Sequence, residues 1–128
     1  MPGRALDLTR INALIRQFAV EREWEQFHSP KNLSMAVAGE AGELLEIFQW
    51  LTEAQSREIM QDARKALAVE EEVADVLICL LRFADVLGID VRAATLAKLK
   101  KNAEKYPVAL AKGSARKYDE LQDGVSAD

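Results

Sequence analysis

The sequence predicts an all-α domain, and three observations support this prediction. Twenty Ala and 16 Leu make helix-favouring residues abundant among the 128 residues. Only three prolines occur, at positions 2, 30 and 107, so long stretches can remain helical. Apolar residues make up 49% and charged residues 30%, which is the balance of a folded globular domain. We expect one domain over residues 1–128, like a four-helix bundle that completes its core by pairing with copies of itself.

Apolar spacing and capping signals place the first two helices. The first is expected over residues 7–25, because apolar residues recur there at steps of three and four. Ser29 followed by Pro30 has the pattern of an N-cap and a first helical position. The second helix is therefore expected to begin at Pro30 and to continue to about Leu51.

A third long helix is expected over residues 68–87. The chain before it predicts a connection over residues 52–56 and a short polar helix over 56–66. The third helix is apolar on most of its circumference, which is typical of a central core helix. Gly88 follows it and is a natural helix stop.

The last expected helix begins after Asp90, whose side chain can cap it. It ends near Tyr106, because Pro107 cannot continue a helix. Gly, Ser, Asp and Lys dominate residues 108–128, which we expect to form an extended C-terminal arm.

Acidic residues occupy unexpected places on the two central helices. Glu40 falls inside the apolar stripe of the second helix, and Glu43 lies on its flank. Glu72 and Asp75 repeat this three-residue spacing beside the stripe of the third helix, with Cys79 between them around the helix. A carboxylate that faces a core without a partner costs several kcal/mol or takes up a proton. The pattern therefore predicts a divalent cation, and ordinary surface acids with salt-bridge partners are the alternative.

Ligand chemistry narrows the choice of metal. Carboxylate oxygens alone favour a hard ion, Mg²⁺ or Mn²⁺. A di-iron bundle would need Glu-x-x-His pairs, and the single histidine of the chain, His28, supplies none.

Two further groups have the chemistry of a nucleotide site. Lys98 and Asn102 share one face of the last helix, where a lysine can hold a phosphate or simply cover apolar surface. Trp24, His28 and Trp50 stand at helix junctions and could form a base-stacking slot, with plain core and hinge packing as the alternative.

Composition argues against several other classes of protein. The net charge of −4 does not favour a general nucleic-acid binder. The longest apolar run is too short to cross a membrane, and no secretory signal precedes the first helix. A single cysteine, Cys79, suits a reducing compartment, so we expect a cytoplasmic protein without membrane or nucleic-acid partners.

Four segments of the chain resemble a known family. Glu40-Ala-Gly-Glu43 and, after 28 intervening residues (44–71), Glu72-Val-Ala-Asp75 are similar to the paired acidic motif of the MazG-like all-α nucleoside triphosphate pyrophosphohydrolases. The segment Trp24-Glu-Gln-Phe-His28 and the later Lys98-x-x-x-Asn102 resemble the dCTP pyrophosphatase branch of this family.

The resemblance implies a Mg²⁺-dependent hydrolase that releases pyrophosphate from a nucleoside triphosphate, most simply dCTP, and so cleanses the nucleotide pool. It implies a homo-oligomer, usually a tetramer, with the site near a subunit interface. It implies metal ligands and substrate contacts, with Glu40 or Glu43 activating water. The implied metal ligands are Glu40, Glu43, Glu72 and Asp75. The implied substrate contacts are Trp24, His28, Trp50, Asp75, Cys79, Lys98 and Asn102.

Two positions in the expected nucleotide pocket depart from animal relatives. Cys79 stands where those relatives have a tyrosine, and Ile15 where they have a histidine. Two alternatives therefore stay open: the same fold acting on another nucleoside triphosphate, and a non-catalytic helical module that binds metal or a partner.

Overall fold

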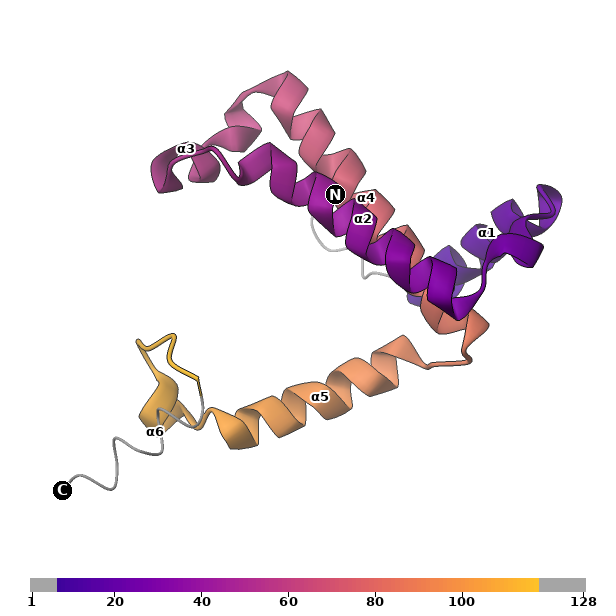
Figure 1. Cartoon of the computed structure of the whole chain (residues 1–128). Helices are drawn as coiled ribbons and strands as arrows, with labels where there is room; N and C mark the ends of the chain where they lie inside the picture. The colour runs from indigo at the N-terminus through magenta and orange to yellow at the C-terminus, as the bar shows by residue number, and fades with distance from the viewer. Residues whose placement is uncertain (1–6, 118–128) are drawn as a thin grey trace. The chain divides into compact units, whose positions relative to one another are not determined.

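The computed structural model describes residues 7–117, and every regular element in that range is a helix (Figure 1). The all-α prediction is confirmed. The chain divides into two compact units, Met1–Ile89 and Asp90–Asp128. Across the described residues, no helix is both long enough and apolar enough to span a membrane.

The first helix, α1 (Leu8–Glu21), is shorter than expected. Asp7 caps it, because the Asp7 side chain accepts a hydrogen bond from the Arg10 amide at 3.2 Å. The predicted end at residue 25 was wrong. Glu23 adopts a left-handed backbone with φ of 55°, which ends the α-helix, and a short 3₁₀ turn, η1 (Trp24–Phe27), follows.

The second helix, α2 (Pro30–Phe48), begins where Ser29 and Pro30 predict. The Ser29 hydroxyl accepts from the Asn32 amide at 3.1 Å. The helix ends slightly before the expected Leu51. Two short helices come next, α3 (Glu53–Arg57) and η2 (Ile59–Gln61).

These short helices begin earlier than the sequence analysis placed them. Residues 52–56 were expected to be a connection, but Thr52 and Gln55 form a capping box that starts α3. The Gln55 side chain accepts from the Thr52 amide at 2.9 Å, and the Thr52 hydroxyl accepts from the Gln55 amide at 3.1 Å.

The long central helix, α4 (Ala63–Val86), starts five residues before the predicted boundary. Asp62 is the reason, because its carboxylate accepts hydrogen bonds from the amides of Arg64 and Lys65. Gly88 follows α4 with φ of 68°, which confirms the predicted stop.

Helices α2 and α4 run antiparallel, side by side, and form the main packing contact of the first unit (Figure 1). Helix α1 packs against α4, and Arg16 of α1 donates two hydrogen bonds to Asp85 of α4. The buried apolar side chains of the described residues are few: Ala19, Leu33, Ile59, Leu81 and Ala84.

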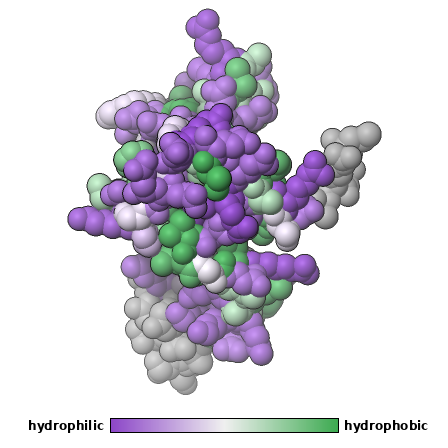
Figure 2. Space-filling view, turned by 90° about the vertical axis from the view of Figure 1, so that its right-hand side faces the viewer, coloured by the Kyte–Doolittle hydropathy of each residue, from purple (hydrophilic) through white to green (hydrophobic). Residues whose placement is uncertain are grey.

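Many large apolar side chains of the first unit remain exposed. On α2 and α4 these include Met35, Leu45, Val73, Ile78 and Leu80. Figure 2 shows apolar patches interrupting the hydrophilic surface on one face of the molecule. Helices α2 and α4 therefore pair with each other while leaving further apolar surface uncovered.

The second unit contains α5 (Val91–Lys105) and the short α6 (Val108–Ala111). Asp90 caps α5 as predicted, accepting from the Ala93 amide at 2.9 Å. The extended arm was expected from residue 108, but residues 108–111 are helical. Residues 118–128 of that expected arm lie outside the described part of the chain.

Candidate functional site

Three of the predicted acidic residues meet between α2 and α4. Glu40 and Glu43 lie one turn apart on α2, and Glu72 lies on α4. One carboxylate oxygen from each lies within 4.8 Å of the other two. We call these three residues the glutamate cluster. The antiparallel pairing of the helices therefore brings together side chains that are far apart in sequence.

Two oxygens of the glutamate cluster lack a donor. Glu40 Oε2 and Glu72 Oε2 are buried and have no hydrogen-bond partner. Buried polar atoms are normally paired, so these oxygens need a proton or a cation. Ion pairs between described residues use Asp85, Glu21 and Glu53 as their acids and do not reach the cluster. This observation favours a metal over the salt-bridged surface alternative.

The electrostatics of the glutamate cluster lead to the same conclusion. Burial, the contacts with Glu43 and Glu72, and the charges of Glu43 and Asp75 raise the pKa of Glu40 to about 7. Burial raises the pKa of Glu72 as well; the contact with Glu40 opposes this effect, and Glu43 and the charge of Asp75 add to it. Crowded carboxylates cannot all ionise without a cation. An oxygen-only donor set of this kind fits a hard divalent ion.

Asp75 and Cys79 lie one turn apart on α4, beside the cluster. Asp75 is exposed and is not among the three acids whose oxygens lie within 4.8 Å, although its charge raises the pKa of Glu40 and Glu72. Cys79 is half-buried, and the pKa of its thiol is raised by burial and by the charges of Glu40 and Asp75. Asp75 therefore adds its charge to that of the cluster, and the Cys79 thiol lies within the field of both.

A hollow of about 360 Å³ adjoins the glutamate cluster between α2 and α4. Its lining is strongly acidic and consists of Glu43, Glu46, Ile47, Ala68, Glu71 and Glu72. An anionic phosphate would enter this hollow only with cations beside it.

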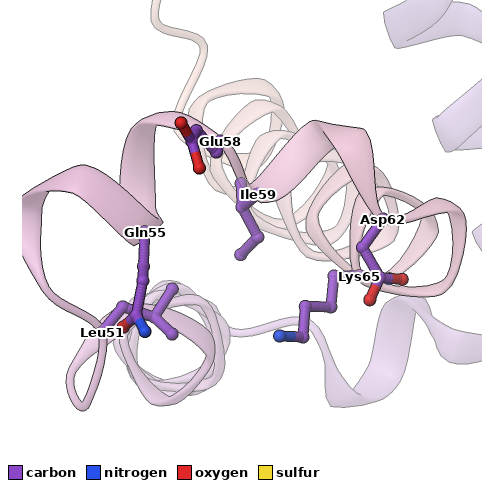
Figure 3. Close-up of a pocket in the computed structure, with 6 residues that line it drawn as sticks. All are labelled: Leu51, Gln55, Glu58, Ile59, Asp62 and Lys65. Atoms are coloured by element: carbon purple, nitrogen blue, oxygen red, sulfur yellow. The ribbon is translucent and has the colours of Figure 1, made fainter.

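A second hollow, of about 180 Å³, lies where the chain passes from α2 to α4 (Figure 3). Its lining residues are Leu51, Gln55, Glu58, Ile59, Asp62 and Lys65. Gln55 completes the capping box of α3, and Asp62 caps α4. Two polar side chains that line this hollow are thus engaged in capping helices. None of the site residues predicted from the sequence lines this hollow.

His28 and Trp24 are brought together at the start of α2. Their rings meet edge to face with centroids 6.3 Å apart, and Trp24 meets Phe18 of α1 in the same way at 5.6 Å. Trp24 is 44% exposed, so part of its surface remains accessible to a ligand. The pair forms one wall against which a planar ring could stack.

Arg82 is a residue of this region that sequence reasoning missed. It is buried on α4, and its Nε donates to His28 Nδ1 at 3.1 Å. The Arg82 guanidinium also forms an ion pair with Asp85, one turn further along α4. The available signal was an arginine inside the most apolar stretch of α4, where a charged side chain needs partners.

Trp50 lies apart from His28 and Trp24 within one copy of the chain. It follows the C-terminal end of α2, while His28 precedes the N-terminal end. A 19-residue helix is about 28 Å long, so α2 holds the two regions apart. Trp50 is also 87% exposed. One copy of the chain therefore does not bring all three rings into a single slot. That such a slot exists stays a prediction.

Lys98 and Asn102 lie one turn apart on α5, in the second unit. Lys98 is exposed and Asn102 is half-buried. Their contact with phosphate stays a prediction.

The fold and the site define a class: an all-α protein with a cluster of carboxylates that could hold a metal, built on two antiparallel helices. A model of the family described as MazG-like matches residues 36–121, a range that contains both acidic motifs. The chain belongs to the MazG-like family.

Relatives of known activity agree with this assignment. The chain is 43% identical over 122 residues to dCTP pyrophosphatase 1 of Homo sapiens, covering 95% of this chain and 70% of that protein. The chain is 40% identical to dCTP pyrophosphatase 1 of Mus musculus, again covering 95% of this chain and 70% of that protein. The crystal structure of a pyrophosphatase from Archaeoglobus fulgidus superposes with a TM-score of 0.74 at 38% identity, covering 84% of this chain and 98% of that one.

Proposed function

We propose that this chain is a Mg²⁺-dependent dCTP pyrophosphatase, which hydrolyses dCTP to dCMP and pyrophosphate. The observation that carries this proposal is the glutamate cluster, in which two buried carboxylate oxygens lack a partner. The relatives named dCTP pyrophosphatase 1 support the reaction and the nucleotide.

The glutamate cluster, with Asp75 beside it, would hold the metal. Its oxygen-only donors suit Mg²⁺, with Mn²⁺ as a substitute. When bound, Mg²⁺ neutralises phosphate charge and orients the phosphate oxygens. The acidic hollow beside the cluster has room for part of a nucleotide once that charge is balanced.

A glutamate of the cluster would position and deprotonate the attacking water. The water oxygen forms a bond to the α-phosphorus, the bond from that phosphorus to the bridging oxygen breaks, and pyrophosphate leaves. The proton of the water passes to the carboxylate of Glu40 or Glu43, whichever is not saturated by metal. Glu40 is half-buried and Glu43 is exposed, so the two offer different access to solvent water.

The remaining predicted residues would bind the nucleotide. Trp24 and His28 form the wall for the base and sugar, and Cys79 lies beside the metal ligands on α4. Lys98 would offset the charge that builds on the departing pyrophosphate, and Asn102 would lie near the phosphates with it.

We also propose a homo-oligomer, most simply a tetramer. The small core and the exposed apolar residues of α2 and α4 support assembly, since such surface is usually covered by a partner. Assembly would let Trp50 of one copy approach the aromatic wall of another. A single cysteine fits the reducing cytoplasm as the place of action. Light scattering of the purified chain tests the copy number.

A substrate panel tests the proposed activity. Pyrophosphate release would be measured from dCTP, 5-methyl-dCTP, dUTP, dTTP, dATP and dGTP with Mg²⁺. We expect dCTP or its 5-methyl form to be preferred. Preference for another base would assign the fold to another nucleoside triphosphate. No release from any nucleotide by folded protein that binds Mg²⁺ would favour the non-catalytic binding module.

A further inference from the structure

Arg82 is the only charged or polar residue among those buried in the described chain, being 6% exposed on α4. Burying a guanidinium is costly unless its donors are paired. Arg82 meets this requirement with two contacts. Its Nε donates to His28 Nδ1 and its Nη1 donates to Asp85 Oδ2, each at 3.1 Å.

The contact with His28 fixes where the imidazole carries its proton. The guanidinium is always charged and can only donate. Nδ1 must therefore accept, which it does only when it carries no hydrogen. In a neutral imidazole the hydrogen then sits on Nε2, and Nε2 becomes a donor. The sequence separation between the two residues is 54, so this bond also ties the residue that follows η1 to the distant α4.

The surroundings of Arg82 keep it in place. Asp85 is shared between Arg82 and Arg16, and Arg16 contacts it through Nε at 2.9 Å and through Nη2. Arg82 is thus oriented by Asp85 on its own helix, while Arg16 braces Asp85 from α1.

The charges around His28 support a neutral ring. Burial and the charge of Arg82 lower the pKa of His28, and Glu25 on η1 opposes them. Asp85 contacts Arg82 and not His28, and its charge is matched by Arg16 of α1 and Arg82 of α4.

We propose that Arg82 is a positioning residue that holds His28 as the neutral tautomer with its hydrogen on Nε2. The pocket would then offer the nucleoside a hydrogen-bond donor without a positive charge. Such a donor recognises an uncharged oxygen of the base or sugar and leaves the phosphates to the metal and to other residues. This inference rests on the proposed function, because it takes His28 to contact the nucleotide.

Nitrogen NMR of the imidazole tests the first half of this proposal without any activity. His28 is the single histidine of the chain, so its ring signals need no assignment. In ¹⁵N-labelled protein at pH 7 we expect one tautomer, with hydrogen on Nε2. A ring with hydrogen on Nδ1, or a mixture of tautomers, would overturn the proposal with the wild-type chain alone.

Variants test whether Arg82 is the cause. Arg82→Met removes the donor and should give mixed tautomers and raise the pKa of His28, because the positive charge beside the ring is lost. Arg82→Gln is smaller and polar and provides a second variant if Arg82→Met folds poorly. Arg16→Met is the matched control, because it loses an Asp85 contact but keeps the bond to His28. The control should retain the wild-type tautomer.

Kinetics test the second half. Arg82→Met should raise KM for dCTP about tenfold and leave kcat within about twofold, because a ground-state contact is misplaced and the metal cluster is untouched. A changed tautomer with an unchanged KM would overturn the role in recognition. If the wild type is inactive on every nucleotide but keeps the single tautomer, the proposed function fails while the assigned Arg82–His28 contact stands.

Discussion

Glu40 on α2 and Glu72 on α4 face each other across the helix pair, each with one buried carboxylate oxygen that has no hydrogen-bond donor. In a folded protein such oxygens are rare, and two of them in one cluster concentrate negative charge where water cannot dilute it. The stability, pH response and activity of the chain should all depend on this arrangement.

The glutamate cluster should destabilise the chain when no metal is present. Glu72→Gln removes one charge and supplies an amide donor, so the melting temperature in chelator should stay equal to or exceed that of the wild type. Thermal melts followed by circular dichroism would measure it. Glu70→Gln, an exposed substitution on the same helix, is the matched control. A variant much less stable than this control would show that the cluster stabilises the metal-free fold.

The stability of the metal-free chain should depend on pH in a defined direction. The pKa of Glu40 rises from 4.5 to about 7 on folding, so the folded state binds more protons than the unfolded state between these values. The contribution of Glu40 to stability should therefore be fully present below about pH 4.5 and should be lost as the pH rises through 7. Urea titrations in chelator at several pH values check this, with Glu40→Gln flattening the dependence.

Adding Mg²⁺ should reverse that dependence. The metal competes with protons for the carboxylates, so its stabilising effect should be larger at pH 8 than at pH 5. An equal Mg²⁺ effect at both pH values would argue against binding at the glutamate cluster.

Asp85 should matter more to stability than its ion pairs alone suggest. Asp85→Ala would leave the buried Arg82 without its carboxylate, which should cost about 3 kcal/mol in the free energy of unfolding. Arg16→Met removes only an exposed partner of Asp85, so the loss of stability should be much smaller. Urea unfolding of both variants gives the comparison. Equal losses would contradict the account of Arg82 as a buried charge held by Asp85.

The Asp85 contribution should also vanish in acid. Hydrogen bonds from Arg16 and the charges of both arginines hold the pKa of Asp85 below its ordinary 3.8. Its stabilisation is thus present above that value and is lost as pH falls through the lowered pKa. We would measure the free energy of unfolding of Asp85→Asn and of the wild type between pH 2 and 6. The two values should become equal only at the acid end of this range.

The start of α4 depends on a single side chain. Asp62→Ala removes the acceptor for the amides of Arg64 and Lys65 and should cost about 1 kcal/mol. Asp62→Asn keeps an oxygen acceptor and should cost less. Chemical denaturation distinguishes the two. Metal binding should survive in both, because Glu72 lies well inside the helix.

Local signals in the sequence predicted much of the fold. Ser29 and Asp90 mark helix starts through side chains that bond within three residues, and Gly88 marks a stop through its own backbone. Two other local features were not predicted. The capping box of Thr52 and Gln55 was overlooked, and the left-handed backbone of Glu23 has no clear sequence signature.

The grouping of acidic residues was predictable in part, because helical spacing fixes which residues share a face. Glu40 and Glu43, three apart, had to neighbour each other, and the apolar stripes indicated that both acidic pairs lie on helices that face a core. Arg82 was missed because its role depends on His28, which approaches it only through tertiary packing. The separation of Trp50 from His28 follows from the length of α2, because the two residues lie beyond opposite ends of this helix. The prediction of a shared aromatic slot did not take this length into account.

The central claim is that the glutamate cluster supports pyrophosphate release. The most direct test measures this release from dCTP at saturating Mg²⁺ and compares Glu72→Gln with Glu70→Gln and the wild type. The account predicts that Glu70→Gln retains wild-type turnover while Glu72→Gln loses at least about a hundredfold, because only Glu72 belongs to the glutamate cluster. Wild-type turnover in a folded Glu72→Gln variant would contradict the account.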